Sequence, residues 1–331
     1  MSDPGSELPE LPDLLAPIQA DLERTRDVLD RELSDNSPAV RDMLDHIGRF
    51  RGKQLRAAMV LLCGRGAGYY SPEHPQVAAV VEMIHLATLV HDDVLDGASV
   101  RRRVASVNTR WDNQVAVLLG DWLYARAFAL STRLESPLVS RHLALTTQKI
   151  CKGEIEQASH RYDFDLSRDS YEAIAGAKTA ALYAAACELG ALYPEGDERT
   201  ASELGLFGWE VGLAFQIVDD VLDLTGTQEE VGKPVGNDVD DGKVTLPVLH
   251  VYASADDAQR AAIRDAYTEP GLDDRVGRLR EVCDLRPGIE AAQRRADELL
   301  RTALGRLAVL PDGPIRETLA RAGSFVLQRR Y

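Results

Sequence analysis

The stretches LVHDDVLD, at residues 89–96, and QIVDDVLD, at residues 216–223, carry the same Asp-Asp-x-x-Asp motif inside apolar sequence. On a helix, residues four apart lie on one face, so Asp92 and Asp96 project together and Asp93 lies about 100° round the axis. The second motif repeats this arrangement with Asp219, Asp220 and Asp223. The sequence therefore predicts two apolar helices, each with three carboxylates near one end. Such clusters indicate a site that binds a cation.

Clustered carboxylates repel one another, and like charges at this spacing destabilise a helix by about a few tenths of a kcal/mol in water, and more when partly buried. A divalent cation removes the repulsion, and Mg²⁺ prefers carboxylate oxygens together with substrate phosphates and water. Lone Asp-Asp pairs also occur at 240–241, 256–257 and 273–274, in polar surroundings and without the third Asp, which is typical of a solvated surface. The two complete motifs therefore predict a Mg²⁺ site for an anionic substrate.

Long proline-poor stretches rich in Ala, Leu, Val and Glu predict helices, several of them apolar on every face. The predicted helices include residues 77–93, 116–134, 173–192 and 201–224, and the predicted loops are 66–75, 163–169, 193–200 and 225–242. Strand signals are nearly absent, so we expect an all-α fold built as a bundle. No linker divides the chain, which predicts one domain over residues 13–331 after a frayed tail at 1–12.

Composition excludes several classes of protein. The chain has 331 residues, 45 % of them apolar, and a formal net charge of -15, which makes it a poor nucleic-acid binder. It has no apolar run long enough to span a membrane, and its N-terminus lacks the basic and apolar parts of a secretory signal. The cysteines form no CxxC pair, so neither a zinc site nor a disulfide framework is indicated, and a cytoplasmic location is expected.

Basic residues accompany both acidic motifs, and any one of them alone is more often a surface ion pair worth under about 1 kcal/mol. Arginine suits bidentate phosphate contacts and lysine supplies a point charge. The candidate cations are Lys53, Arg56, Arg101, Arg102, Arg103, Lys178, Lys233 and Lys243.

Several stretches together resemble the trans-isoprenyl diphosphate synthases, the polyprenyl synthetase family. They are GKQLR at 52–56, HLATLVHDDVLD at 85–96, RR at 101–102, LLGDWLYARAF at 118–128, KTAALYAAACELGA at 178–191, GLAFQIVDDVLDLTG at 212–226 and GKPVGNDVDDGKVTLPVL at 232–249. The resemblance covers about residues 40–250, and the last third of the chain is less distinctive.

The resemblance implies an all-α fold around a deep central cavity, a homodimer, and three Mg²⁺ ions per active site when substrate is bound. The main metal ligands would be Asp92, Asp96 and Asp219, assisted by Asp93, Asp220 and Asp223. The isopentenyl diphosphate site would be formed by Lys53, Arg56, His85 and Arg102. The allylic diphosphate would be held by Arg101, Lys178, Thr179, Gln216, Lys233 and Lys243, with Phe215 near the reacting carbons.

The implied reaction is a head-to-tail (1'-4) condensation of isopentenyl diphosphate with an allylic diphosphate. Ionisation of the allylic substrate would be assisted by Asp92, Asp96, Asp219, Lys178, Lys233 and Arg101. The sequence departs from the family pattern in two places. In RGKQLRA, at residues 51–57, Gln54 replaces a basic residue and Ala57 a proline, and after the first acidic motif Arg103 replaces a common glycine. Neither removes a matched phosphate ligand.

Product length depends on where the apolar tunnel for the growing chain is blocked, because each buried CH₂ gains about 0.8 kcal/mol. In family members with short products, bulky aromatics often occupy the two positions that are Ala87 and Thr88 here. Ile84 and Val80 are the next candidates on the same helix. These small and medium side chains predict an all-trans product longer than C15.

Two other readings compete with this one. A class I terpene cyclase usually pairs one aspartate-rich motif with an Asn/Ser/Glu-type triad and an aromatic pocket, whereas this chain has two DDxxD motifs and 6 % aromatics. A non-catalytic partner subunit typically loses aspartates or basic ligands, and this chain keeps both sets.

Overall fold

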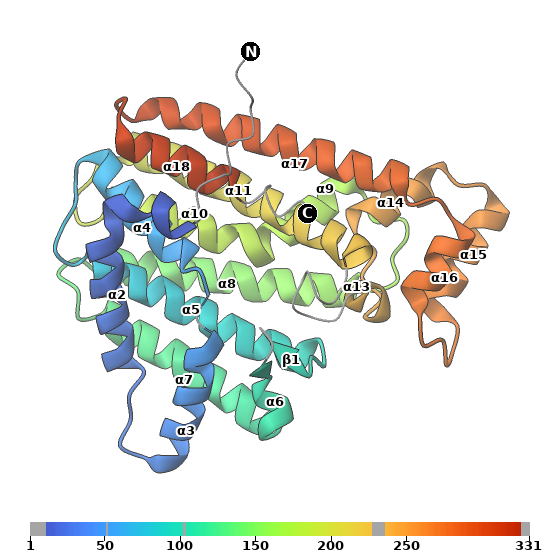
Figure 1. Cartoon of the computed structure of the whole chain (residues 1–331), viewed down its shortest axis with the longest axis horizontal. Coiled ribbons are helices and arrows are strands. Elements are labelled where there is room, and N and C mark those ends of the chain that lie inside the picture. The colour runs from blue at the N-terminus through green and yellow to red at the C-terminus, as the bar shows by residue number, and fades with distance from the viewer. Residues whose placement is uncertain (1–10, 51, 102–103, 227–235, 326–331) are drawn as a thin grey trace.

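The computed structural model describes residues 11–50, 52–101, 104–226 and 236–325. Within these ranges the chain is helical except for connecting segments and one antiparallel hairpin, formed by β1 (Val100–Arg101) and β2 (Val104–Ala105) (Figure 1). The prediction of an all-α fold is confirmed. In the described ranges, no helix combines the length and the hydropathy needed to cross a membrane.

The helices fall into three groups along the chain. The first group is α1 (Leu11–Leu14), α2 (Gln19–Glu32), α3 (Pro38–Ile47) and α4 (Leu55–Ala67), with 3-10 turns at Ala16–Ile18 and Gly48–Phe50. The second is α5 (His74–Leu95), α6 (Val107–Arg110), α7 (Asn113–Ser131), α8 (Leu138–Ser159), α9 (Arg168–Ala175), the π-helical turn η3 (Gly176–Ala180) and α10 (Ala181–Leu192). The third is α11 (Glu198–Thr225), α13 (Asn237–Asp240), α14 (Leu246–Ser254), α15 (Asp257–Thr268), α16 (Arg275–Val282), α17 (Arg286–Arg306), a 3-10 turn at Leu307–Val309, and α18 (Pro314–Ser324).

The long helices run side by side along the longest axis of the molecule, and α15 and α16 project at one end (Figure 1). Helix α10 lies at the centre, packed against α4 on one side and α11 on another, while α5 packs on α7 and α17 covers α11. All four helices expected at 77–93, 116–134, 173–192 and 201–224 are present. The two acidic motifs therefore sit on α5 and α11, each in the last turns of its helix.

The structure departs from the sequence-based expectation in three places. The stretch 173–192 contains the π-helical turn η3 between α9 and α10, and the hairpin β1–β2 follows the first motif. Residues 227–235 of the expected loop 225–242 lie outside the described residues, and its described part contains the short helix α13. One turn of helix and two-residue strands are too short to show a period in the sequence.

Two glycines allow α10 to pack closely between its neighbours. A Cβ atom at Gly190 would lie 2.3 Å from the carbonyl oxygen of Val60 on α4. A Cβ atom at Gly208 on α11 would lie 2.4 Å from the carbonyl oxygen of Tyr183 on α10. At both places, backbone meets backbone where any side chain would separate the helices.

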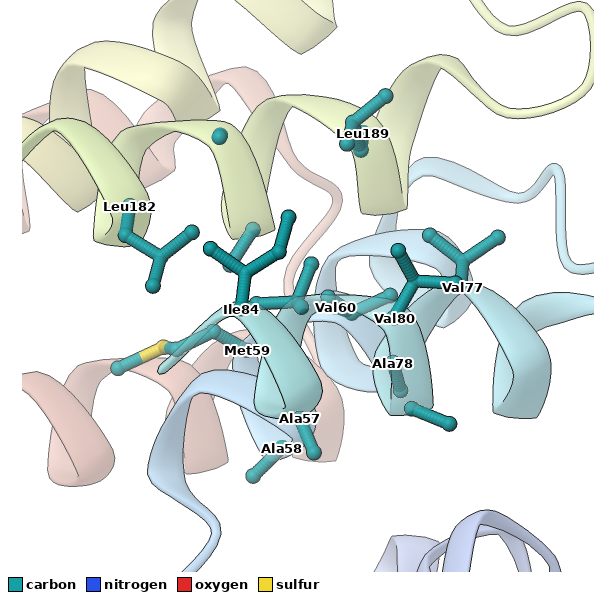
Figure 2. Close-up of a cluster of buried hydrophobic side chains, with 14 of the residues drawn as sticks. Ala57, Ala58, Met59, Val60, Val77, Ala78, Val80, Ile84, Leu182 and Leu189 are labelled. Carbon is teal, nitrogen blue, oxygen red and sulfur yellow. The ribbon is translucent and has the colours of Figure 1, made fainter. Parts of the chain in front are cut away.

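Apolar side chains from α4, α5 and α10 fill the space between these helices (Figure 2). Ile84 and Val80 on α5 are fully buried and lie beside Leu182 and Leu189 of α10, with Val60 of α4 between them (Figure 2). Each such side chain contributes about 1.5 to 3 kcal/mol when it leaves water. This packed core supports the helix end that carries the first acidic motif.

His74 begins α5 and is completely buried between α4 and α10. Its Nδ1 accepts from the backbone N–H of Ser71 at 2.9 Å, so its Nε2 carries the proton and donates to the carbonyl oxygen of Gly190 at 2.9 Å. The ring also stacks on Tyr70 with centroids 4.6 Å apart. These contacts suit the neutral ring, and burial lowers the pKa of His74.

We predict that stability falls as the pH drops below about 6.5, because the unfolded chain then binds a proton that buried His74 does not accept. One such group contributes a slope of at most about 1.4 kcal/mol per pH unit. The variant His74→Gln should be less stable at neutral pH but should lose this slope between pH 6.5 and 5.5. Urea unfolding at several pH values measures the slope of the unfolding free energy with pH. His250→Gln, at an exposed histidine, is the matched control and should keep the wild-type slope. An unchanged slope in His74→Gln would contradict this assignment.

Candidate active site

A single cavity of about 1140 Å³ brings the two motifs and most of the predicted cations together. Its walls come mainly from α5, α8, α9, α10 and α11, with the hairpin and the start of α4. The predicted site residues that line it are Lys53, Arg56, His85, Thr88, Asp92, Asp96, Arg101, Lys178, Thr179, Phe215, Gln216, Asp219, Asp220 and Lys243. Arg102, Arg103 and Lys233 lie outside the described residues.

Asp92 and Asp96 of the first motif line the cavity at the C-terminal end of α5. The C-terminal end of a helix carries a partial negative charge, which adds to the repulsion between the carboxylates. Burial raises the pKa of Asp92, and the negative charge of Asp96 acts in the same direction. Although burial also opposes ionisation of Asp96, the nearby Lys243 and Lys178 hold the pKa of Asp96 below its ordinary value.

The middle aspartate of this motif does not line the cavity. Asp93 is fully buried, and Arg101 donates to its Oδ1 through Nε at 2.7 Å and through Nη2 at 2.6 Å. The backbone carbonyl of Asp93 also accepts from the side-chain amide of Asn108 at 3.1 Å. Asp93 thus ties the hairpin to α5 and orients Arg101, which itself lines the cavity.

In the second motif, too, two aspartates line the cavity and one does not, but here it is the third. Asp219 and Asp220 line the cavity, whereas Asp223 is buried away from it and accepts from the backbone N–H of Asp238 at 3.0 Å. Burial raises the pKa of Asp220 to about 8, and the nearby Asp238 contributes to the shift. Of the six motif aspartates, four face the cavity and two, Asp93 and Asp223, secure the segments beside it.

Two partly buried lysines neutralise part of this negative charge. Lys243 Nζ lies 2.9 Å from Asp96 Oδ1, 3.0 Å from Asp241 Oδ2 and 3.6 Å from Asp238 Oδ1. It therefore joins the segment after the second motif to the first motif, across 147 residues of sequence. Burial opposes its charge, but Asp238, Asp96 and Asp241 together raise the pKa of Lys243 well above its ordinary value.

Lys178 belongs to η3 and pairs with α8. Its Nζ lies 3.0 Å from Glu154 Oε2 and donates to Gln157 Oε1 at 3.0 Å. Burial works against the charged form, yet Asp92 and Glu154 raise the pKa of Lys178. Lys178 therefore remains a cation within reach of the first motif.

A second group of cations lines the cavity where α4 begins. Arg56 Nη1 lies 3.2 Å from His85 Nε2, and the Arg56 guanidinium stacks over Tyr183 at 4.2 Å. Lys53 Nζ lies over the ring of Phe325 at 4.3 Å. Lys53, Arg56 and His85 were all predicted from the resemblance to hold one diphosphate, and the structure brings them to one cavity wall.

Of the three residues expected to control product length, only Thr88 lines the cavity. Ala87 and Ile84 are completely buried and lie outside the cavity wall. The rotation of about 100° per residue turns Ala87 away when Thr88 faces inward. Ile84 instead packs in the core beside Leu182 (Figure 2).

Several residues that line the site were not predicted from the sequence. They are Glu82, Glu154, Gln157, Tyr171 and Asp238. Glu154 and Gln157 stand three residues apart in KGEIEQ, a spacing that puts both on one helix face, but nothing in the sequence links α8 to Lys178. Glu82 is a buried carboxylate inside an apolar helix, and it accepts from the backbone N–H of Ala57 at 3.0 Å.

The arrangement fits Mg²⁺ as a shared cation. Within the described ranges, no group of three or more His, Cys, Asp or Glu side chains is close enough to enclose a metal ion by itself. The four motif carboxylates that face the cavity are nevertheless the donors that Mg²⁺ prefers, and this ion usually keeps waters and substrate phosphates in its shell. The donor set suits ions that bind together with a diphosphate.

Comparison with known proteins agrees with this fold and site. The family model for polyprenyl synthetase matches residues 37–284. The heptaprenyl diphosphate synthase component 2 of Bacillus subtilis is 36 % identical, covering 92 % of this chain and 88 % of that protein. The octaprenyl diphosphate synthase of Escherichia coli is 34 % identical, covering 84 % of this chain and 86 % of that one.

Solved structures give the same result. A decaprenyl diphosphate synthase from Rhodobacter capsulatus superposes with a TM-score of 0.90 at 34 % identity, over 96 % of this chain and 99 % of the other. A polyprenyl synthase from Caulobacter crescentus, complexed with calcium and isoprenyl diphosphate, has a TM-score of 0.91 at 32 % identity, over 97 % and 98 % of the two chains. The chain belongs to the polyprenyl synthetase family and is a trans-prenyltransferase of the polyprenyl diphosphate synthase class.

The different placement of Asp92 and Asp93 leads to a test with two matched variants. We expect Asp92→Asn to lower kcat by about a thousandfold or more, since it removes a carboxylate that faces the cavity. The metal-free protein should keep or gain stability, because burial disfavours the charged Asp92. Asp93→Asn should instead lower the free energy of unfolding by about 1 to 3 kcal/mol and reduce kcat only about 10- to 100-fold through Arg101.

Steady-state kinetics with saturating Mg²⁺ and urea unfolding of the metal-free variants measure the two effects. Equal losses of activity in both variants, with no difference in stability, would mean that Asp93 faces the substrate after all.

Proposed function

We propose that this enzyme condenses isopentenyl diphosphate with an allylic diphosphate, head to tail, and repeats the step to make a long all-trans polyprenyl diphosphate. The observation that carries the proposal is that carboxylates from α5 and α11 line one cavity together with two separate sets of cations. One set surrounds the motifs, and the other lies at the start of α4. Two diphosphate groups can therefore bind in the same cavity at once.

The allylic diphosphate binds between the two motifs. Lys178, Lys243 and Arg101 line this part of the cavity and offset the negative charge that develops on the leaving diphosphate. Mg²⁺, when bound by Asp92, Asp96, Asp219 and Asp220, supplies the Lewis acid that assists departure of the diphosphate. We infer three ions per site in the presence of substrate, as the family resemblance implies.

Isopentenyl diphosphate binds at the start of α4. Lys53, Arg56 and His85 hold its diphosphate and point its double bond at the allylic carbon, which is worth several kcal/mol of entropy. The allylic carbon-oxygen bond breaks, the double bond supplies the electron pair of the new 1'-4 carbon-carbon bond, and a proton leaves to the released diphosphate. No redox partner is needed, and the product is again an allylic diphosphate.

The product is longer than C15, and we place it at C35 or longer. Relatives along most of the chain are named for seven, eight and nine isoprene units. Thr88 contributes only a small side chain to the cavity wall, and the same wall includes the apolar Leu89, Ile150 and Leu182. Each further isoprene unit buried along such a wall gains about 3 to 4 kcal/mol.

The test of this function is to incubate the protein with Mg²⁺, labelled isopentenyl diphosphate and allylic primers of increasing length, and to size the dephosphorylated products. The wild type should give a ladder that ends above C20. Thr88→Phe should shorten the longest product by one or more isoprene units while keeping the first condensation, because an aromatic ring there fills the cavity. Thr88→Ser is the matched control and should keep the wild-type ladder. A wild-type product of C15 or C20 would refute the open cavity, and no incorporation with any primer would refute the reaction.

We further propose that the enzyme is a cytoplasmic homodimer. The four cysteines are free, as expected in a reducing compartment. Helices α7 and α8 expose large apolar side chains, among them Leu118, Leu145 and Ile155, at 59 %, 68 % and 70 % exposure. Exposed apolar groups of this size are typical of an interface. The relatives named component 2 raise the alternative that a different chain covers this surface.

Light scattering after size exclusion should give twice the chain mass of 36.3 kDa for the purified protein alone. The double variant Leu145→Glu with Ile155→Glu should be monomeric, because it places charges in the interface. Leu206→Glu changes an exposed apolar residue on α11 and should remain a dimer. A monomeric wild type without activity would favour a second, different subunit.

A further inference from the structure

One chain of hydrogen bonds, buried at Tyr171 and Asp220, joins the second acidic motif to two other elements of the site. The hydroxyl of Tyr171 on α9 donates to Asp220 Oδ2 at 2.5 Å. On the other side, Gln216 Nε2 donates to Asp220 Oδ1 at 2.7 Å. Thr179 of η3 then donates to Gln216 Oε1 at 2.6 Å. Tyr171 has no part in the mechanism described above, although it lines the same cavity.

The Tyr171 hydroxyl, the Asp220 carboxyl group, the Gln216 amide and the Thr179 hydroxyl form one continuous chain of donors and acceptors. The Tyr171 hydroxyl donates to Asp220 Oδ2, and burial together with the nearby Asp220 holds the pKa of Tyr171 well above its ordinary value. The Gln216 amide joins the two ends of the chain, because its oxygen accepts from Thr179 and its nitrogen donates to Asp220. Asp220 is only 4 % exposed, whereas Thr179 and Gln216 are partly buried in the cavity wall.

The Tyr171 end of the chain is anchored to the bundle. The next residue, Glu172, accepts from Arg295 on α17 through two hydrogen bonds, at 2.9 and 2.8 Å. Ser167 caps the start of α9 by accepting from the backbone N–H of Ser170 at 3.1 Å. Helix α9 is therefore held at its N-terminus and against α17, so its tyrosine has a defined position.

The Thr179 end is equally constrained. Thr179 lies in the π-helical turn η3, a deviation from α-helix that is frequent at functional sites. A Cβ atom at Gly176 would lie 2.3 Å from the Trp209 ring on α11, and one at Gly153 on α8 would lie 2.8 Å from the backbone nitrogen of Lys178. The turn is thus packed between α8 and α11, and Thr179 directly follows Lys178 in it.

We propose that Tyr171 is a positioning residue for the second acidic motif, an inference that rests on the proposed function. It holds the Asp220 carboxylate in the orientation that binds a divalent cation. Through Gln216 and Thr179 it also couples that carboxylate to the turn that carries Lys178. Binding of a divalent cation at the second motif and binding of the allylic diphosphate by Lys178 then depend on each other.

Tyr171→Phe removes only the hydroxyl and tests the proposal directly. The divalent affinity of the second motif should fall about tenfold to a hundredfold, as for other residues that orient a metal ligand. The probe is Mn²⁺ titrated in the presence of inorganic diphosphate and followed by electron paramagnetic resonance, which does not require turnover. The Mg²⁺ concentration for half-maximal activity should rise by the same factor, while kcat at saturating Mg²⁺ changes less.

Tyr252→Phe is the matched control, because Tyr252 is buried in the same part of the core and lines no part of the cavity. It should keep the wild-type Mn²⁺ affinity. If Tyr171→Phe lowers the melting temperature but leaves Mn²⁺ affinity unchanged, Tyr171 is merely structural and the proposal is wrong.

Thr179→Val cuts the other end of the chain and tests the coupling without changing Tyr171. The two substitutions act through the same Gln216–Asp220 pair, so their effects on Mn²⁺ affinity should not add in the double variant. Additive effects would overturn the coupling. Weakened Mn²⁺ binding in Tyr171→Phe, with a wild type that makes no prenyl product, would support the positioning role and reject the proposed function instead.

Discussion

Mutual repulsion among carboxylates shielded from water is the constraint that organises this active site. Four aspartates from two helix C-termini face one cavity, where the helix ends add negative potential and burial penalises every charge. Such an arrangement is stable only when cations are close. In the described structure, Lys243 and Lys178 neutralise part of the negative charge of these aspartates. The negative charge that remains explains why the site is suited to divalent ions that bind with a diphosphate.

The same constraint explains the rigidity of the surrounding fold. Carboxylates that repel each other would separate if their helices could move, and these helices are held by close packing. Backbone meets backbone at Gly190 and Gly208, and buried apolar side chains fill the space between α4, α5 and α10. The helices set the distance between the motifs, and polar contacts then orient individual side chains.

Several polar side chains beside the cavity hold neighbouring segments in place. Asp93 and Asp223 belong to the motifs by sequence but secure neighbouring segments, through Arg101 and the backbone of Asp238. Glu82 satisfies a backbone donor at the start of α4, where Lys53 and Arg56 meet the cavity. The site is therefore a shell of residues that orient others as much as a set of residues that contact substrate.

The sequence by itself determined the helical fold, the two acidic helix ends and most of the cations around them. Long apolar periods and the i, i+4 spacing of Asp92 and Asp96 are local properties, and local geometry is sufficient to read them. Which carboxylates face the cavity was decided only by the tertiary structure. The pairing of Lys243 with Asp96 joins residues 147 apart, and the contacts of Lys178 with α8 and of Tyr171 with Asp220 also cross between elements. The π-helical turn, the short hairpin and the inward rotation of Thr88 rather than Ala87 depend on how neighbouring helices pack, and no local period in the chain encodes that packing.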